Sequence, residues 1–281
     1  MSRRAILLVC LFFPGLLLAE GEMPGSSSFY MSGLLAGNIQ YQQTSAGTGS
    51  NFRTFSVPII LPMEANLGRF NIGGHVQYDV KEFASGNQTQ HIEGPGYVGA
   101  TGRFQALRGD RYRLEFIEGI DVPVSRAETD NLPLQSQAFL TAGYRVDSGL
   151  AFSYLFDRAQ LQFGVGHRLN LAKNAYNPGD EMSASIRFGY GLGSQTDFQR
   201  RFPVSLFLGI TSRYRYADQY QKELVQGTEY GTVFVAPGFQ FQTNAVILHA
   251  TVEVPVYHMR PTPDSFQDRM RGNIGMKYML R

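Results

Sequence analysis

Residues 181–194 read EMSASIRFGYGLGS, and apolar side chains occupy every second position from Met182 to Leu192, apart from the small Ala184. The positions between them are small or polar, including Ser185 and Arg187. A period of two places alternate side chains on opposite faces of a β-strand. The stretch therefore predicts a long strand with one apolar face and one polar face.

The same alternation recurs along the whole chain. A soluble β-sandwich would also alternate, but soluble strands are usually about five or six residues long, so we favour a membrane barrel. Residues 135–156 are read as one strand, because the apolar face continues through 147–149 and an even strand number is typical of bacterial barrels. The twelve predicted strands are 28–44, 52–64, 68–83, 95–107, 111–125, 135–156, 159–171, 181–194, 201–217, 232–242, 245–258 and 271–280.

The connections between these strands alternate in length. The long ones are 45–51, 84–94, 126–134, 172–180, 218–231 and 259–270, and the short ones are 65–67, 108–110, 157–158, 195–200 and 243–244. Outer-membrane barrels have long extracellular loops and short periplasmic turns. This alternation predicts that both chain ends lie on the periplasmic side.

The composition agrees with a membrane location. Charged residues make up 17% of the chain, and Gly (31), Phe (21) and Tyr (15) are abundant. Soluble domains usually contain about 25% charged residues. A charge-poor exported chain without a predicted membrane helix leaves a closed barrel as the membrane option. The predicted fold is an all-β, transmembrane antiparallel β-barrel of about 12 strands in the outer membrane of a Gram-negative bacterium.

The N-terminus has the three regions of a secretory signal peptide. Arg3 and Arg4 precede an apolar run that ends before Ala19, so we expect residues 1–19 to be removed and 20–281 to form the barrel. Removing them takes away Cys10, the single cysteine, and the formal charge of +2. A near-neutral chain without cysteine predicts neither nucleic-acid binding nor disulfide or thiolate chemistry.

The chain ends on another alternating stretch. Asn273-x-Gly275-x-x-Tyr278-x-Leu280 is similar to the C-terminal signal that the barrel-assembly machinery reads. Two features depart from that signal: Leu280 stands where an aromatic residue is usual, and Arg281 follows it. The similarity implies the assembly machinery as a partner during biogenesis, with outer-membrane lipid as the surroundings.

Three segments also carry a Val-Pro or Ala-Pro step within a predicted strand: 114–125, 232–242 and 250–258. Together with the closing 272–280, they resemble the outer-membrane transporters of the phenol meta-pathway degradation type. The resemblance implies passive uptake of a small solute, with aromatic compounds as the suggested class, and no cofactor. Because proline removes a ladder hydrogen bond, we expect Pro123, Pro237 and Pro255 near barrel rims or bulges.

The polar parity predicts which side chains face the lumen. The selected pathway candidates are Arg113, Glu115, Arg187, Arg213, His249 and Glu253. Further inward residues are Arg103, Arg145, Arg168, Arg215, Lys277, Asp79, Asp121 and His75. Two interpretations stay open: a polar pathway with a mild cationic bias, or ion pairs that fill and brace the lumen. Twelve strands fall between packed small barrels and open porins.

An outer-membrane lipid-modifying hydrolase, such as a phospholipase or lipid A deacylase, is the alternative function. None of the five histidines begins a His-x-Ser motif. Ser148 and His167 are expected to lie opposite each other on the outer face, with no obvious third member of a catalytic set. Glu118 breaks the apolar parity of its strand and predicts a bulge or an interfacial position.

Two other readings are weaker. His75 and His249 lack the ligand-spaced partners of a metal site. A structural or adhesive barrel without transport is a further alternative, although the longest predicted loop, 218–231, is short for a binding surface.

Overall fold

The computed structural model describes residues 36–45, 51–67, 69–85, 88–124, 143–172, 175–193, 203–243, 246–259 and 267–278. The predicted signal peptide 1–19 lies outside these residues, as do 28–35 of the first predicted strand and Leu280 of the last.

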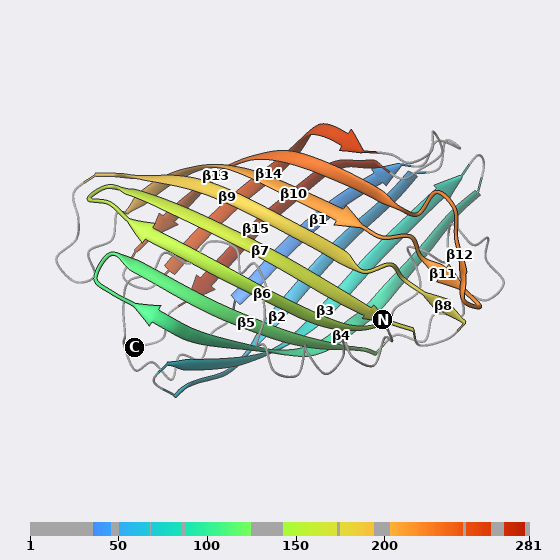
Figure 1. Ribbon diagram of the computed structural model, residues 1–281, viewed down its shortest axis with the longest axis horizontal. Coiled ribbons are helices and arrows are strands. Elements are labelled where there is room, and N and C mark those ends of the chain that lie inside the picture. Colours follow the sequence, from blue (N-terminus) through green and yellow to red (C-terminus); the bar gives the residue numbers. More distant parts are fainter. Residues whose placement is uncertain are drawn as a thin grey trace, which may run out of the picture.

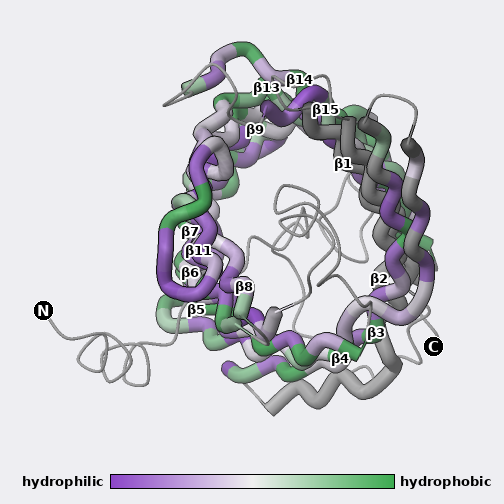
Figure 2. Tube along the Cα trace, turned by 90° about the vertical axis from the view of Figure 1, so that its right-hand side faces the viewer, coloured by the Kyte–Doolittle hydropathy of each residue, from purple (hydrophilic) through white to green (hydrophobic). Residues whose placement is uncertain are grey.

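Within the described residues, twelve strands form one closed antiparallel barrel, which confirms the predicted fold class and strand number (Figure 1). They are β1 (Ala36–Ser45), β2 (Asn51–Leu67), β3 (Phe70–Ser85), β4 (Gln88–Arg108), β5 (Tyr112–Pro123), β6 (Tyr144–Leu155), β7 (Ala159–Leu171), β9 (Glu181–Leu192), β10 (Val204–Arg215), β13 (Tyr230–Gln242), β14 (Val246–Met259) and β15 (Gln267–Tyr278). β15 pairs with β1 and closes the ring, which Figure 2 shows end-on. None of the described residues belongs to a helix long and apolar enough to cross a membrane.

Three short strands are not part of the barrel wall. β8 (Tyr176–Asn177), β11 (Gln219–Tyr220) and β12 (Glu223–Leu224) form a small sheet at one end of the barrel (Figure 1). They belong to the connections β7–β9 and β10–β13. We call this the loop end and the opposite end, with turns 109–111 and 156–158, the turn end. The β7–β9 and β10–β13 connections are long, as predicted, whereas the predicted long connection between β3 and β4 is short.

One predicted loop is wrong. Residues 84–94 were expected to be irregular, but β3 and β4 continue as a paired hairpin to Ser85 and Gln88. Pro95 and Gly96 fit within β4 because the β3–β4 register shifts there. Gln77 pairs with Tyr97 and Tyr78 pairs with Pro95, so Gly96 is the extra residue of a bulge. A bulge of this kind accommodates a proline that a regular ladder would exclude. The start of β4 therefore lies within the stretch predicted as a loop.

The strand predicted for 135–156 is confirmed only in its second half. β6 begins at Tyr144 and runs through 147–149, so the predicted absence of a turn there is confirmed. Gly143 lies outside the strand, and 125–142 are outside the described residues.

The prolines divide in a similar way. Pro123 ends β5 and Pro255 lies at the β13–β14 bulge, whereas Pro237 lies within β13, where β14 offers it no Cα partner.

The two faces of the wall differ as the parity predicted. Outward side chains are apolar and exposed, as in Leu206, Leu208 and Ile210 of β10. Aromatic side chains such as Tyr112 and Tyr190 lie outward near the turn end. Buried polar side chains, among them Gln160 and Thr211, have the opposite parity. An apolar exterior around a polar interior is the arrangement of a protein solvated by lipid.

Candidate functional site

The strand register places two of the predicted pathway residues at the turn end of β5. Arg113 and Glu115 are two positions apart on the inward face, and Arg113 Nη1 lies 3.2 Å from Glu115 Oε1. Both side chains are only 17% exposed. They form one local ion pair, which braces the wall at this end.

Two other predicted pathway residues form an ion pair along the inner face, nearer the loop end. Arg213 of β10 reaches across β13 to Glu253 of β14, with Nη2 3.3 Å from Oε2. The Glu253 side chain is almost fully buried, whereas that of Arg213 is about a third exposed. The carboxylate therefore neutralises a cation that still meets the interior.

Arg187 differs from both arginines. It lies in the middle of β9 on the inward face, and its stem packs over Gly209 of β10. Among the described residues no carboxylate lies within ion-pair distance of Arg187, which is half-buried. The predicted pathway residues thus form separate pairs and one unpaired cation at different heights, with no single charged ring.

His249 has a packing role that the sequence did not predict. Its ring lies over Gly275 of β15, since a Cβ added at Gly275 would come within 3.0 Å of three ring atoms. Gly275 belongs to the predicted assembly signal. Its contact with the His249 ring is a second reason for glycine at this position, because a larger residue would clash with the ring. Asn273, two residues earlier, is buried on the same inward face, while the side chains of Tyr278 and Leu280 lie outside the described part of the structure.

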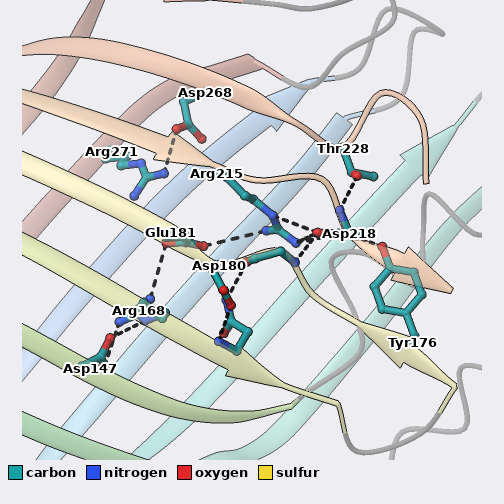
Figure 3. A network of polar contacts seen from close by, with 12 residues as sticks. Asp147, Arg168, Tyr176, Asp180, Glu181, Arg215, Asp218, Thr228, Asp268 and Arg271 are labelled. Carbon is teal, nitrogen blue, oxygen red and sulfur yellow. Dashed lines mark hydrogen bonds and ion pairs between the residues drawn. The ribbon is translucent and has the colours of Figure 1, made fainter. Parts of the chain in front are cut away.

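A larger charged network, shown in Figure 3, lies near the loop end. Arg168 donates from Nε to Oδ1 of Asp147 at 2.7 Å and from Nη2 to Oδ2 at 3.2 Å. Glu181 lies between two arginines, 3.8 Å from Arg168 Nη1 and 3.9 Å from Arg215 Nη1. Asp147, Arg168, Glu181 and Arg215 are successive Cα partners on β6, β7, β9 and β10. Alternating charge along one ladder row favours the pairing of these four strands.

Asp218 connects this row to the small sheet. The fully buried carboxylate accepts hydrogen bonds from Arg215 Nη2 at 2.9 Å, from the Gly179 amide at 2.6 Å and from the Tyr176 hydroxyl (Figure 3). Its own amide donates to Thr228 Oγ1 at 2.8 Å. Burial, reinforced by the Asp218 carboxylate, raises the pKa of the Tyr176 hydroxyl, so the hydroxyl stays protonated and remains the donor even at alkaline pH. Asp218 therefore fastens both loop connections to the barrel wall.

The sequence contained part of this network. Arg168 and Arg215 were predicted to face inward, and Asp147 and Glu181 have the same parity on their strands, so the same rule could have found them. Asp218 and Thr228 lie in a connection, where no periodicity applies. Their contacts depend on tertiary structure alone.

A third inward cluster occupies β3 to β6. His75 Nε2 lies 3.0 Å from Asp121 Oδ1, and Arg145, the Cα partner of Asp121, lies 3.8 Å above the Tyr97 ring. Within the described residues, no group of three or more histidine, cysteine or acidic side chains has the arrangement of a metal site. His75 instead contacts the Asp121 carboxylate within this wall.

The outward polar residues also come together. Ser148 pairs with His167 across β6 and β7 as predicted, and on its other side it pairs with Glu118 of β5. Glu118 is thus an acidic neighbour of this pair that the sequence pattern did not reveal. However, a catalytic triad places the histidine between serine and acid, whereas here the serine lies in the middle. No hydrogen bond joins Ser148 to His167 in the described part of the chain.

Similarity to solved structures agrees with this geometry. The COG4313 outer membrane channel from Pseudomonas putida F1 has a TM-score of 0.67 at 12% identity, covering 92% of this chain and 100% of that one. The β domain of the Bordetella autotransporter BrkA has a TM-score of 0.57 at 15% identity, covering 89% and 99%. The translocator domain of the autotransporter NalP from Neisseria meningitidis has a TM-score of 0.56 at 9% identity, covering 90% of each chain.

The fold is that of a bacterial outer-membrane β-barrel. No family model matches the sequence, and no curated protein does. The likeness is thus one of fold, which confirms the expected outer-membrane location together with the apolar exterior. The narrower resemblance to phenol meta-pathway transporters and the assembly-machinery partner stay predictions.

Proposed function

We propose that the protein is a channel for passive uptake of small solutes across the outer membrane. The observation that carries this proposal is an inner wall in which several charges are paired, while no described carboxylate lies within ion-pair distance of Arg187, Arg103 or Arg145. Ion pairs hold the wall, and an unpaired inward cation gives a passing solute a charge to meet. The likeness in fold to a barrel described as an outer membrane channel supports the proposal.

The proposed class of solute rests on a resemblance in sequence. The resemblance of the last strands to phenol meta-pathway transporters suggests aromatic or other sparingly soluble compounds. No cofactor or covalent step is part of the proposal, because a concentration gradient suffices to drive uptake.

The test is conductance of the purified barrel in planar bilayers, together with uptake of small acids and aromatic compounds into liposomes. Stable conductance and saturable uptake are expected. Arg187→Gln and Arg213→Gln should each shift the ion selectivity toward cations, the second because Glu253 loses its partner. Arg158→Gln, at an exposed turn, is the control and should leave selectivity unchanged.

A barrel that passes neither ions nor solutes would contradict the proposal. If the same preparation hydrolysed phospholipid, and Ser148→Ala abolished that hydrolysis, the hydrolase alternative would replace it.

A further inference from the structure

Three buried polar side chains on the inner wall have hydrogen-bonding atoms without partners. Gln160 of β7 is 2% exposed, Ser205 of β10 is 1% exposed and Gln240 of β13 is 4% exposed. Among the described residues, neither amide atom of Gln160 has a hydrogen-bond partner, nor does Ser205 Oγ or Gln240 Oε1. Buried polar atoms are normally paired. Several unpaired atoms in one region of the wall therefore indicate a place where a polar ligand is held.

The register places these residues near the aromatic ring of Phe207 and on the turn-end side of Arg187. Gly189 of β9 has Gln160 as its Cα partner on one side and Phe207 of β10 on the other. Ser205 precedes Phe207 by two residues and is the Cα partner of Gln240. We call Gln160, Arg187, Ser205, Phe207 and Gln240 the Gln160 patch. All five have inward parity and lie in the part of the wall between mid-barrel and the turn end.

Two glycines shape this patch. A Cβ added at Gly189 would lie 2.7 Å from Cδ1 of Phe207, so the ring rests against the bare backbone there. A Cβ at Gly209 would lie at ordinary van der Waals distance, 3.6 Å, from Cβ and Cγ of Arg187, so the start of the arginine stem lies beside this glycine. The aromatic ring and the guanidinium stem are therefore supported side by side on neighbouring strands.

We propose that the Gln160 patch binds a small aromatic carboxylate that also carries a hydroxyl group. This inference rests on the proposed channel function and specifies its substrate class. Arg187 would hold the carboxylate, since guanidinium matches a planar carboxylate with two parallel hydrogen bonds. Phe207 stacks on the aromatic ring of the ligand. The amides of Gln160 and Gln240 and the Ser205 hydroxyl supply donors and acceptors for the ligand hydroxyl.

The decisive experiment measures binding separately from transport. The purified, folded barrel in detergent is titrated with 4-hydroxybenzoate, benzoate, 4-hydroxybenzyl alcohol and acetate by calorimetry, and liposome uptake is measured for the same four compounds. We expect 4-hydroxybenzoate to bind most tightly. Arg187→Gln should weaken its binding by roughly tenfold or more, the effect of losing a charged hydrogen bond. The same change should leave binding of 4-hydroxybenzyl alcohol nearly unaltered.

Two further variants separate the other contacts. Phe207→Leu should reduce the preference for 4-hydroxybenzoate over acetate, and Gln160→Leu should reduce the preference over benzoate. The matched control is Arg103→Gln on β4, an inward arginine separated from β9 by β5, β6 and β7. It removes the same charge and should leave 4-hydroxybenzoate affinity unchanged. Heat-modifiable gel migration shows that each variant is folded.

The outcomes for the site and for the channel are distinct. If the barrel conducts ions but binds all four compounds alike, or if Arg103→Gln weakens binding as much as Arg187→Gln, the site is refuted and the channel stands. If the barrel does not conduct but shows binding that depends on Arg187, Phe207 and Gln160, the site is supported and the channel is refuted.

Discussion

Arg187 and Arg213 lie on neighbouring strands and face the same interior, yet only Arg213 has a carboxylate beside it. Glu253 lies 3.3 Å from Arg213, whereas no described carboxylate is that close to Arg187. The charge of Arg213 is therefore partly neutralised by its neighbour, whereas the charge of Arg187 is not. Substitution of Arg213 removes one positive charge and also leaves the buried Glu253 carboxylate without its partner.

The Arg213–Glu253 pair predicts a charge cycle. Glu253→Gln should shift the ion selectivity toward anions, Arg213→Gln should shift it toward cations, and the double variant should return close to the wild-type value. Reversal potentials in a salt gradient measure each effect. Unchanged selectivity in both single variants would show that the pair does not face the conducting path.

Gly275 is a second position where one atom decides the local structure. Gly275→Ala would press a Cβ into the His249 ring, and overpacking of this kind typically costs about 1–3 kcal/mol. Denaturant unfolding of the refolded barrel in lipid vesicles measures the loss. His249→Ala in the same chain should restore most of it, because the ring that clashes has been removed. An equal loss in the double variant would place the cause elsewhere.

Elements of the wall depend on their connections as well as on their ladders. β8 and the β11–β12 hairpin have only two residues per strand, too few to be stable alone. Asp218 stabilises this small sheet, since its carboxylate accepts hydrogen bonds from Arg215 of the wall, from the Gly179 backbone and from the Tyr176 hydroxyl. The loop-end sheet is therefore an extension of the wall held by one buried carboxylate.

Asp218→Ala should release this sheet without unfolding the barrel. Removing one partner of a buried ion pair costs about 3–5 kcal/mol, so cleavage within 172–180 or 216–229 by added protease should be roughly a hundredfold faster. Mass spectrometry of the fragments locates the cleavage, and heat-modifiable migration reports the intact barrel. Glu223→Ala, an exposed acidic change on β12, is the control. Unchanged protease resistance in Asp218→Ala would contradict the role given to Asp218.

The C-terminal strand predicts an assembly defect. β15 closes the barrel by pairing with both β1 and β14. Replacing both Tyr278 and Leu280 by Asp should block insertion, chiefly through poorer recognition by the assembly machinery, because charges near an interface cost only about 0–1 kcal/mol. Immunoblots of outer-membrane fractions measure the level. Deleting Arg281 should have little effect, and a normal level of the double variant would refute the assembly signal.

The whole molecule has two unlike ends. The loop end carries the small sheet and the long β3–β4 hairpin, while the turn end has connections such as 109–111 and 156–158 (Figure 1). Charged and aromatic side chains are arranged along this axis, with the Asp218 network near the loop end and the Gln160 patch toward the turn end. The direction of insertion therefore decides which group a solute from outside meets first.

We expect the loop end to face the cell exterior. A peptide tag inserted at 221–222, in the β11–β12 turn, should be labelled by antibody on intact cells, and a tag at 243–244 should be labelled only after permeabilisation. Comparable membrane levels of the two tagged proteins are the control. The opposite labelling pattern would reverse the orientation and with it the order of sites along the path.

The sequence by itself determined the fold class, the number of barrel strands and the face of each side chain, because a period of two is a local property of the chain. It also marked Arg187 and Glu253 as inward. It did not determine which charges meet. Asp147 and Arg168 are 21 residues apart, Arg213 and Glu253 are 40 apart, and Asp218 reaches Gly179 across 39. Those pairings depend on strand register, which is decided only when β15 closes on β1 and all twelve ladders are set together.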